Sequence, residues 1–425
     1  MTAIDTKCVQ AGYTPGNGEA RVIPIVQSTT FAYDTPEEMG DLFDLKKAGY
    51  FYTRLGNPTV GGLEEKLTAL EGGTAALCAA SGMSAIMLAT LNVCKTGDNF
   101  LSTSNIYGGT YNLFNVTLRK LGIECRFYEA NDSKEKIESL IDDKTRFIFA
   151  ETIANPAGIV IDFDKLTSIA KKYGMLFMVD STIATPCICR PIEWGADVVI
   201  HSTTKYLDGH ATSVGGAIIE SGEFNFVGNP RYPDFNTPDA SYHGLVFARD
   251  AGKTPFTMRA RVIGMRDLGA QMAPMNAFLT MLGTDTLHLR MARHSENALA
   301  LAKALEKHPQ VEWVKYAGLE SDENYARANK YFDNGNCSGM VTFGIKGGRE
   351  AAMTFQKALK LFKVVTHIAD SRSCVLHPAS TTHRQLSDAD LVACGVAANL
   401  IRLSVGTESA SDIIADVINA LDSAK

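Results

Sequence analysis

The apolar positions of the chain form short runs that alternate with amphipathic segments from about residue 63 onward. Runs such as FIFA, and LFMVD up to its final Asp, are apolar throughout, which is typical of strands buried on both faces of a sheet. Connections of helical length between such strands predict parallel order and an α/β fold. The strands are expected at residues 75–79, 99–103, 124–128, 146–151, 176–180, 197–201 and 216–220. The helices before and between them are expected at residues 63–70, 83–93, 110–120 and 163–173.

Two regions flank this alternation and differ from it in pattern. Residues 1–60 are rich in Gly, Pro, Thr and Tyr without a sustained period, which predicts an extended arm. Residues 61–265 would form a large α/β domain. Over residues 266–425, a helical run from about Pro274 and then mixed patterns predict a linking helix and a smaller α+β domain. The helices of that domain are expected at residues 350–361 and 411–420.

Composition and charge narrow the classes of function. The 425 residues include 41 Lys and Arg against 47 Asp and Glu, and so lack the basic surplus of a nucleic-acid binder. A hydrophobic content of 45% argues against a disordered chain. The opening residues lack the apolar core of a secretory signal, and the longest apolar stretch, residues 83–93, is too short to span a bilayer. The nine cysteines are an odd number without a CxxC pair, which predicts reduced thiols, a cytoplasmic location and no metal site.

An Asp and a Lys follow two neighbouring strands of the expected sheet. Asp180 ends the strand LFMVD, and Lys205 follows the next one in HSTTKYLDGH. The carboxyl ends of strands are where α/β sheets bind ligands, so both side chains can reach one crevice. Pyridoxal phosphate needs such a pair, a Lys to hold its aldehyde and an anion to keep its ring nitrogen protonated. The alternative is a solvated Lys and a capping Asp.

Neighbouring residues favour the cofactor. Gly82 and Met83 stand where a strand gives way to a helix, and the backbone N–H groups of a helix start bind phosphate. Ser202 and Thr204 place hydroxyls near Lys205. Tyr107, after the next strand, would lie at the same edge and could stack on the ring, or it could be a core aromatic. The segment Ser202 to Lys205 also matches the SxxK of serine acyl hydrolases, but the KTG that follows it in those enzymes precedes it here.

Several longer motifs occur in one order along nearly the whole chain. They are GYFYTRLGNPTVGGLEEKLTALEGG, AASGMSAI, IYGGTYNLF, ETIANPAG, VDSTIATP, HSTTKYLDGH, HPASTTHRQLS and IRLSVGTES. In this combination the chain resembles the Cys/Met-metabolism family of pyridoxal-phosphate enzymes. The segments YHGLVF and RDLGAQMAPMNAFLTMLGTDTLHLRMARHSENALALAKAL are most similar to the O-acetylhomoserine sulfhydrylases of that family. The resemblance implies a fold-type I transferase with a mostly parallel, seven-stranded type of sheet.

The resemblance also implies roles for the residues that carry the cofactor. Lys205 would hold the cofactor covalently and then shuttle protons, and Asp180 would pair with the ring nitrogen. The phosphate would be bound by the backbone of two residues and two hydroxyls, namely Gly82, Met83, Ser202 and Thr204. Tyr52 and Arg54, in the arm, would reach the phosphate of a neighbouring subunit, which implies a homotetramer built as a dimer of dimers with shared sites.

Further residues would act on the ring or on the substrate. Asn155 would hydrogen-bond the ring hydroxyl, and Glu151 would order the loop that carries it. Tyr107 would stack on the ring and assist proton transfer. Arg402, in IRLSVG, would bind the substrate carboxylate through two hydrogen bonds, and Arg372 is a second candidate for that contact.

The implied activity is replacement at the γ carbon of O-acetyl-L-homoserine by sulfide or methanethiol, giving homocysteine or methionine and acetate. Competing activities within the family are those of methionine γ-lyase and of cystathionine γ-synthase or lyase, and outside it stands a non-catalytic binder of the cofactor. The lyases tend to carry a Cys two positions after the stacking Tyr, where this chain has Gly109.

Two departures from the family pattern are His367, in place of Ser or Asn, and Ala369, in place of Gly. His367 would line the substrate pocket or be a structural histidine. The acyl group of the donor, the acceptor, residual lyase activity, regulation and the role of His367 stay open.

Overall fold

The computed structural model describes residues 2–381, 384 and 397–424. Its large sheet has seven strands in the order β1-β7-β6-β5-β4-β2-β3. The strands are β1 (Ala75–Ala79), β2 (Asn99–Thr103), β3 (Glu124–Tyr128), β4 (Thr145–Glu151), β5 (Leu176–Asp180), β6 (Val198–His201) and β7 (Gly216–Glu220). Only β7 runs antiparallel to its two neighbours within this sheet. The mostly parallel α/β fold is therefore confirmed.

Side chains of the central strands alternate between two apolar layers. Met178 packs in the cluster beneath α4 (Gly82–Val93), whereas the adjacent Val179 packs in the cluster that holds α3 (Pro58–Glu71) and α7 (Phe163–Tyr173). The two-residue period of a strand sends successive side chains to opposite faces. The positions of a strand that are covered on both faces must be apolar, which explains the continuous run from Leu176 to Val179.

Local capping signals set where these helices begin and end. The Asn57 side chain accepts a hydrogen bond from the Thr59 backbone at the start of α3, and this helix ends at Gly72 with a φ of 76°. The side chain of Asp162 caps α7 in the same way, and Gly174 ends it. Glycine suits both ends because it adopts positive φ without a steric penalty. The cap places the start of α3 at Pro58, ahead of the expected Leu63.

The helix expected over residues 110–120 differs in the structure. It is divided into α5 (Gly108–Asn112), a π-helical turn (Leu113–Thr117) and a 3-10 turn (Leu118–Leu121). Phe114 in the π-helical turn and Leu118 in the 3-10 turn are nevertheless completely buried. An apolar pattern reports which residues are buried but not the local width of a helix.

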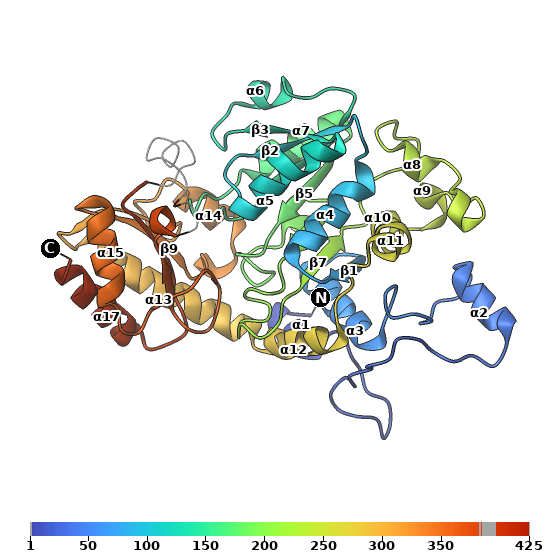
Figure 1. The fold of residues 1–425 in the computed structure, drawn as a ribbon, viewed down its shortest axis with the longest axis horizontal. Helices are drawn as coiled ribbons and strands as arrows, with labels where there is room; N and C mark the ends of the chain where they lie inside the picture. Colours follow the sequence, from blue (N-terminus) through green and yellow to red (C-terminus); the bar gives the residue numbers. More distant parts are fainter. Residues whose placement is uncertain (1, 382–383, 385–396, 425) are drawn as a thin grey trace.

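The remaining α- and π-helical elements of the large domain are short. These short elements are α6 (Lys134–Glu138), α8 (Pro233–Asn236), α9 (Phe247–Asp250), α10 (Pro255–Arg259), a π-helical turn (Ala260–Met265) and α11 (Arg266–Leu268). A pair of longer helices leads out of the domain. Helix α12 (Pro274–Asp285) packs against α3, and the long α13 (Leu287–Glu306) continues into the smaller domain (Figure 1).

The smaller domain is built on a five-stranded sheet in the order β10-β11-β12-β9-β8. Its strands are β8 (Val311–Lys315), β9 (Met340–Ile345), β10 (Lys363–Val364), β11 (Cys374–Leu376) and β12 (Leu400–Ser404). Its helices are α14 (Tyr325–Tyr331), α15 (Gly348–Ala358) and α17 (Ala410–Asp422). Helix α13 packs on α17, β8 and β9, and so supports the sheet from one side (Figure 1).

The N-terminal arm contains two helices that the sequence analysis did not predict. Helix α1 (Ile4–Gln10) buries Cys8 completely and contacts α3, α12 and α13. Helix α2 (Pro36–Phe43) stands away from the body at the right of Figure 1. Its start is marked by Thr35, whose side chain accepts a hydrogen bond from the Glu38 backbone. The prediction of an extended arm is therefore wrong at these two helices, because segments of seven and eight residues are too short to show a period.

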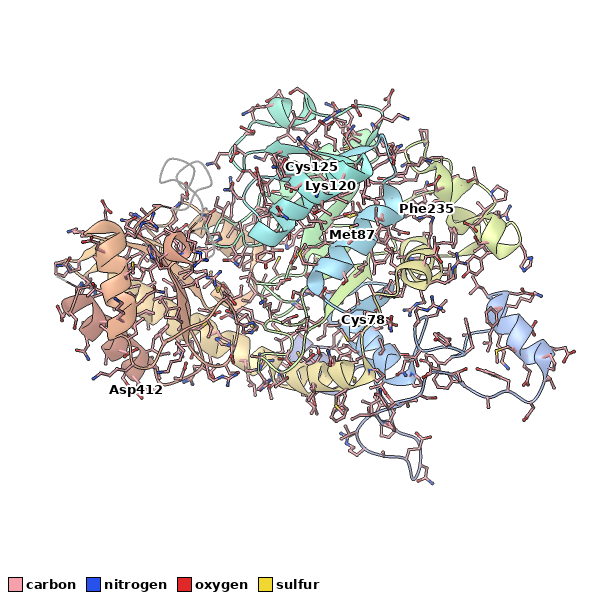
Figure 2. All side chains as sticks on the ribbon, viewed as in Figure 1. Cys78, Met87, Lys120, Cys125, Phe235 and Asp412 are labelled. Atoms are coloured by element: carbon pink, nitrogen blue, oxygen red, sulfur yellow. The ribbon has the colours of Figure 1, made fainter. Side chains whose placement is uncertain are left out.

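The thiols of the described part of the chain are all free and buried. They are Cys8, Cys78, Cys94, Cys125, Cys187, Cys189, Cys337 and Cys374. Figure 2 shows Cys78 and Cys125 within the large domain, and Asp412 at the edge of the smaller one. Cys394 and most of the motif HPASTTHRQLS after Thr381 lie outside the described residues. Among the described residues, no helix has the length and apolar character needed to cross a membrane.

Candidate active site

One cavity lies at the carboxyl ends of β4, β5 and β6 and is closed by segments of the smaller domain. It is lined by ten of the residues singled out in the sequence: Gly82, Met83, Tyr107, Glu151, Asn155, Asp180, Ser202, Thr204, Lys205 and Arg402. These residues come from both domains and span more than three hundred positions of the chain. The site is therefore assembled by tertiary structure.

The start of α4 forms one end of the cavity. Ser81 caps the helix by accepting a hydrogen bond from the Ser84 backbone at 3.0 Å. The first N–H groups of a helix have no partner within it, so those of Gly82 and Met83 are available to an anion. A Cβ atom at Gly82 would lie 2.7 Å from the Cβ of Ser202. Only glycine lets the backbone approach the Ser202 hydroxyl this closely, as a phosphate bound between the two requires.

Thr204 has a structural partner on the same side of the cavity. Its hydroxyl donates to the carbonyl of Gly215 and accepts from the backbone N–H of Gly215, both at 3.1 Å. These bonds tie the segment after β6 to the start of β7. Because a hydroxyl has two acceptor sites and one hydrogen, a phosphate would have to replace one of these bonds.

Two carboxyl groups lie side by side at the ends of adjacent strands. Glu151 of β4 pairs in register with Asp180 of β5. Burial raises the pKa of Asp180, and burial together with the charge of Asp180 raises the pKa of Glu151 well above its usual value. Buried like charges favour a proton or a cation between them. A protonated ring nitrogen beside Asp180 would supply that positive charge.

Glu151 also accepts hydrogen bonds from the backbone N–H groups of two other site residues. Its Oε1 accepts from the N–H of Tyr107 at 2.7 Å, and its Oε2 accepts from the N–H of Asn155 at 3.4 Å. The role expected for Glu151, ordering this loop, is consistent with these bonds. Tyr107 is half exposed and stands just before α5, where the absence of a side chain at Gly109 leaves room for its ring.

Lys205 and Arg402 face the same cavity, and the charge of Arg402 acts on the amine of Lys205. Burial and the charge of Arg402 lower the pKa of Lys205 to about 8. The amine of Lys205 can therefore be neutral at a pH where an ordinary lysine is almost fully charged. A neutral amine is what attack on an aldehyde or removal of a proton requires.

Arg402 is buried on β12, yet its partners are distant. Its Nη1 donates to Asn155 Oδ1 at 3.4 Å, and its Nη2 donates to the carbonyl of Thr366 at 3.5 Å. None of the carboxylates in the described ranges forms an ion pair with it. Burial lowers its pKa. A buried guanidinium with two long hydrogen bonds is suited to a carboxylate ligand.

Three of the residues expected to bind the cofactor or the substrate lie outside this cavity. Tyr52 and Arg54 line a separate cavity of 860 Å³ between the arm and the segment that follows α10. There Arg54 lies over the Tyr52 ring and donates to the carbonyl of Arg266. Arg372 is exposed and donates to Asp370 at 2.9 Å. The geometry therefore favours Arg402 over Arg372 as the carboxylate ligand.

Sequence reasoning missed several lining residues, among them Thr182. Its backbone donates to Asp180 Oδ1 at 2.9 Å, and its hydroxyl accepts from the Ser202 backbone at 2.8 Å. It thus connects the carboxylate to the phosphate end of the cavity. The sequence signal that could have identified Thr182 was its position two residues after Asp180.

The cavity fits pyridoxal phosphate at each of its functional groups. The start of α4 with Ser202 suits the phosphate, and Lys205 suits the aldehyde. The charge on Asp180 suits the ring nitrogen, and Asn155 can reach a ring hydroxyl.

Comparisons with known proteins agree over the length of the chain. Residues 5–422 match the family described as Cys/Met metabolism PLP-dependent enzyme. The O-acetyl-L-homoserine sulfhydrylase of Leptospira meyeri is 44% identical over 410 residues, which are 95% of this chain and 92% of that protein. The homocysteine synthase of Schizosaccharomyces pombe is 42% identical over 421 residues, 98% of each chain.

A solved structure is similar over the whole fold. It is a putative O-acetylhomoserine (thiol)-lyase from Campylobacter jejuni, with a TM-score of 0.96, 38% identity, and coverage of 99% of this chain and 100% of that one. It carries N'-pyridoxyl-lysine-5'-monophosphate at position 205. On these similarities, the chain belongs to the Cys/Met-metabolism family of pyridoxal-phosphate-dependent enzymes.

Proposed function

We propose that this enzyme replaces the acetate of O-acetyl-L-homoserine by sulfide to give homocysteine. The observation that carries the proposal is one cavity in which a lysine of lowered pKa, a buried aspartate and a buried guanidinium meet. The relatives named above as sulfhydrylase and homocysteine synthase support the choice of reaction.

Each group of the cavity then has a chemical task. Lys205 would hold the cofactor through its aldehyde, and its amine would remove and return protons on the substrate carbons. Asp180 keeps the ring nitrogen protonated. Pyridoxal phosphate supplies a ring that withdraws electrons from these carbons and stabilises their negative charge. Arg402 binds the substrate carboxylate and so places the α carbon within reach of Lys205.

The remaining residues hold the cofactor or the reacting groups in place. Gly82, Met83, Ser202 and Thr204 bind the phosphate, and Asn155 binds the ring hydroxyl. Tyr107 covers the ring and exchanges a proton with the leaving group.

We also propose that the enzyme is a homotetramer in which the arm completes the site of a neighbour. Tyr52 is 39% exposed, and it lies with Arg54 in a cavity apart from the one that holds Lys205. An exposed aromatic and a charge stacked on it are suited to a phosphate brought by a second copy.

The free thiols of the described residues are consistent with a cytoplasmic location.

The reaction is tested by product analysis of the enzyme loaded with pyridoxal phosphate. It is incubated with O-acetylhomoserine, with and without sulfide, and separately with methionine. Homocysteine formed only with sulfide supports the proposal, and methanethiol in place of sulfide tests the alternative acceptor. Rapid formation of 2-oxobutanoate and methanethiol from methionine alone would instead identify a γ-lyase. Replacing the acetyl ester by the succinyl or phosphoryl ester then identifies the donor.

A further inference from the structure

His367 lies in the loop between β10 and β11 and approaches the cavity from the smaller domain. Its Nδ1 is 3.2 Å from the Nζ of Lys205. The backbone around it is fixed, because its carbonyl accepts from the Cys374 thiol at 3.3 Å and the next residue but one, Ala369, donates to Ser404 Oγ at 2.8 Å. Thr366 and Ile368 line the cavity on either side of it. The imidazole is thus held against Lys205 by its own loop.

The direction of the hydrogen bond follows from the chemistry of the two groups. A charged Lys205 can only donate, so Nδ1 of His367 must accept. Burial and the charge of Lys205 lower the pKa of His367, so its imidazole is neutral near neutral pH and carries its hydrogen on Nε2. Nε2 is buried and has no hydrogen-bond partner among the described residues. Lys205 is therefore the group toward which this side chain is oriented.

A second histidine of the same domain shows what a structural role looks like. His377 bonds Ser380 Oγ through Nδ1 and the carbonyl of Ala398 through Nε2, both at 2.8 Å. Both of its ring nitrogens bind the protein's own framework. His367 differs because its bonded nitrogen meets the reactive amine and its other nitrogen meets no acceptor in the described part of the chain.

We propose that His367 is a positioning residue for Lys205. Its neutral imidazole accepts a hydrogen bond from the amine and restricts that amine to the direction from which it meets the cofactor's aldehyde and, later, the substrate's α carbon. The proposal rests on the proposed function only in assigning Lys205 to the cofactor. It does not depend on the identity of the substrate.

The test measures how fast the full-length protein, freed of its cofactor, captures pyridoxal phosphate at neutral pH. Binding is followed by absorbance with no amino acid present. His367→Leu removes the acceptor, and His367→Asn keeps an acceptor, because Oδ1 of Asn can lie where Nδ1 lies. His308→Leu is the matched control, since His308 is also buried and its Nδ1 also accepts a hydrogen bond, from Gln310, but at the far end of α13.

We expect His367→Leu to slow capture about tenfold, because the amine loses the hydrogen bond that orients it, and His367→Asn and His308→Leu to stay within about twofold. In the loaded enzyme, His367→Leu should lower kcat about tenfold and leave KM for the amino-acid ester within about twofold. Capture by His367→Leu at the rate of the unsubstituted protein would overturn the proposal. So would a His367→Asn variant as slow as His367→Leu.

Two further arrangements keep the result decisive. If circular dichroism shows that His367→Leu does not fold, His367→Ala takes its place under the same criteria. Covalent capture of the cofactor by Lys205→Ala would refute the role proposed for Lys205, and with it the positioning role of His367. Normal capture by His367→Leu in a protein that does form homocysteine overturns the positioning role alone.

Discussion

The cavity around Lys205 and the arm that carries Tyr52 and Arg54 differ in how their polar groups are satisfied. In the cavity, Glu151 binds two backbone N–H groups and the pKa of Lys205 is lowered by its surroundings. In the arm, α2 stands away from the body and large aromatic side chains are exposed (Figure 1). In the cavity the polar groups are bonded to groups of the same chain, whereas the arm presents side chains that its own chain does not cover.

The difference separates the part of the chain suited to chemistry, the buried cavity, from the part suited to assembly, the exposed arm. Groups that handle protons must be desolvated, because burial is what moves a pKa toward neutrality. Groups that bind a neighbour's ligand must stay exposed until the subunits meet. The predictions below separate these two kinds of contribution.

The largest effect is expected for Lys205→Ala. It should abolish covalent binding of the cofactor and lower the rate of homocysteine formation by about 10⁴ or more, because both the attachment and the proton transfers are lost. Lys165→Ala is the matched control, since burial also lowers the pKa of Lys165, on α7 and away from the cavity. Absorbance of the gel-filtered protein reports binding. A Lys205→Ala protein that keeps the cofactor through denaturation would refute the assignment.

Arg402→Leu tests the substrate end of the cavity. Loss of a charge-assisted bidentate contact should raise KM for the amino-acid ester by about 10- to 100-fold. Arg372→Leu should change KM by less than about twofold, because Arg372 is exposed and bonded to Asp370. Steady-state kinetics of both variants decides between the two arginines. The opposite ranking would transfer the role to Arg372.

The pH dependence of cofactor capture tests the desolvation of Lys205. Only the neutral amine attacks the aldehyde, so the rate should rise with pH through about 8 and level off above it. At pH 7 it should be about a tenth of its maximum. Arg402→Leu should move the midpoint to higher pH, because the charge of Arg402 disfavours the ammonium form. An unchanged midpoint would show that burial alone sets this pKa.

The arm is tested by mixing two inactive variants. Arg54→Ala would remove the phosphate contact that we propose for the neighbouring subunit, and Lys205→Ala would disable the subunit's own site. Random mixing should restore about a quarter of the activity, because half of the dimers are mixed and each has one intact site of two. Activity after dissociation and reassembly of the subunits is the measurement. No recovery in mixtures that do exchange subunits would argue against shared sites.

The smallest effect is expected for Gly109→Ala. A Cβ atom at this position would lie 2.5 Å from Tyr107 Cε1, so the ring must turn away from its place over the cavity. We expect kcat to fall about threefold to tenfold. Gly108→Ala is the control, since a Cβ atom there would have no neighbour within 4 Å. Equal rates for the two variants would show that the ring position of Tyr107 is unimportant.

Much of the fold could be predicted because its signals are local. The run LFMVD and the position of Asp180 at its end are both readable from a few residues, and β5 has these bounds. The helices of the arm were missed, although the TPEE segment of α2 holds a capping signal. The contact between His367 and Lys205 has no local signal, because 162 positions separate the two residues.

The amino-acid sequence by itself determined the order of the elements, the residues at the ends of the strands and the resemblance to one enzyme family. These follow from apolar periodicity and from motifs, which act over neighbouring residues. Only the tertiary structure decided that β7 lies antiparallel between β1 and β6 and that Arg402 and His367 of the smaller domain meet Lys205 of the large one. Such contacts depend on how two sheets and the helices between them pack, and that packing is a property of the whole chain.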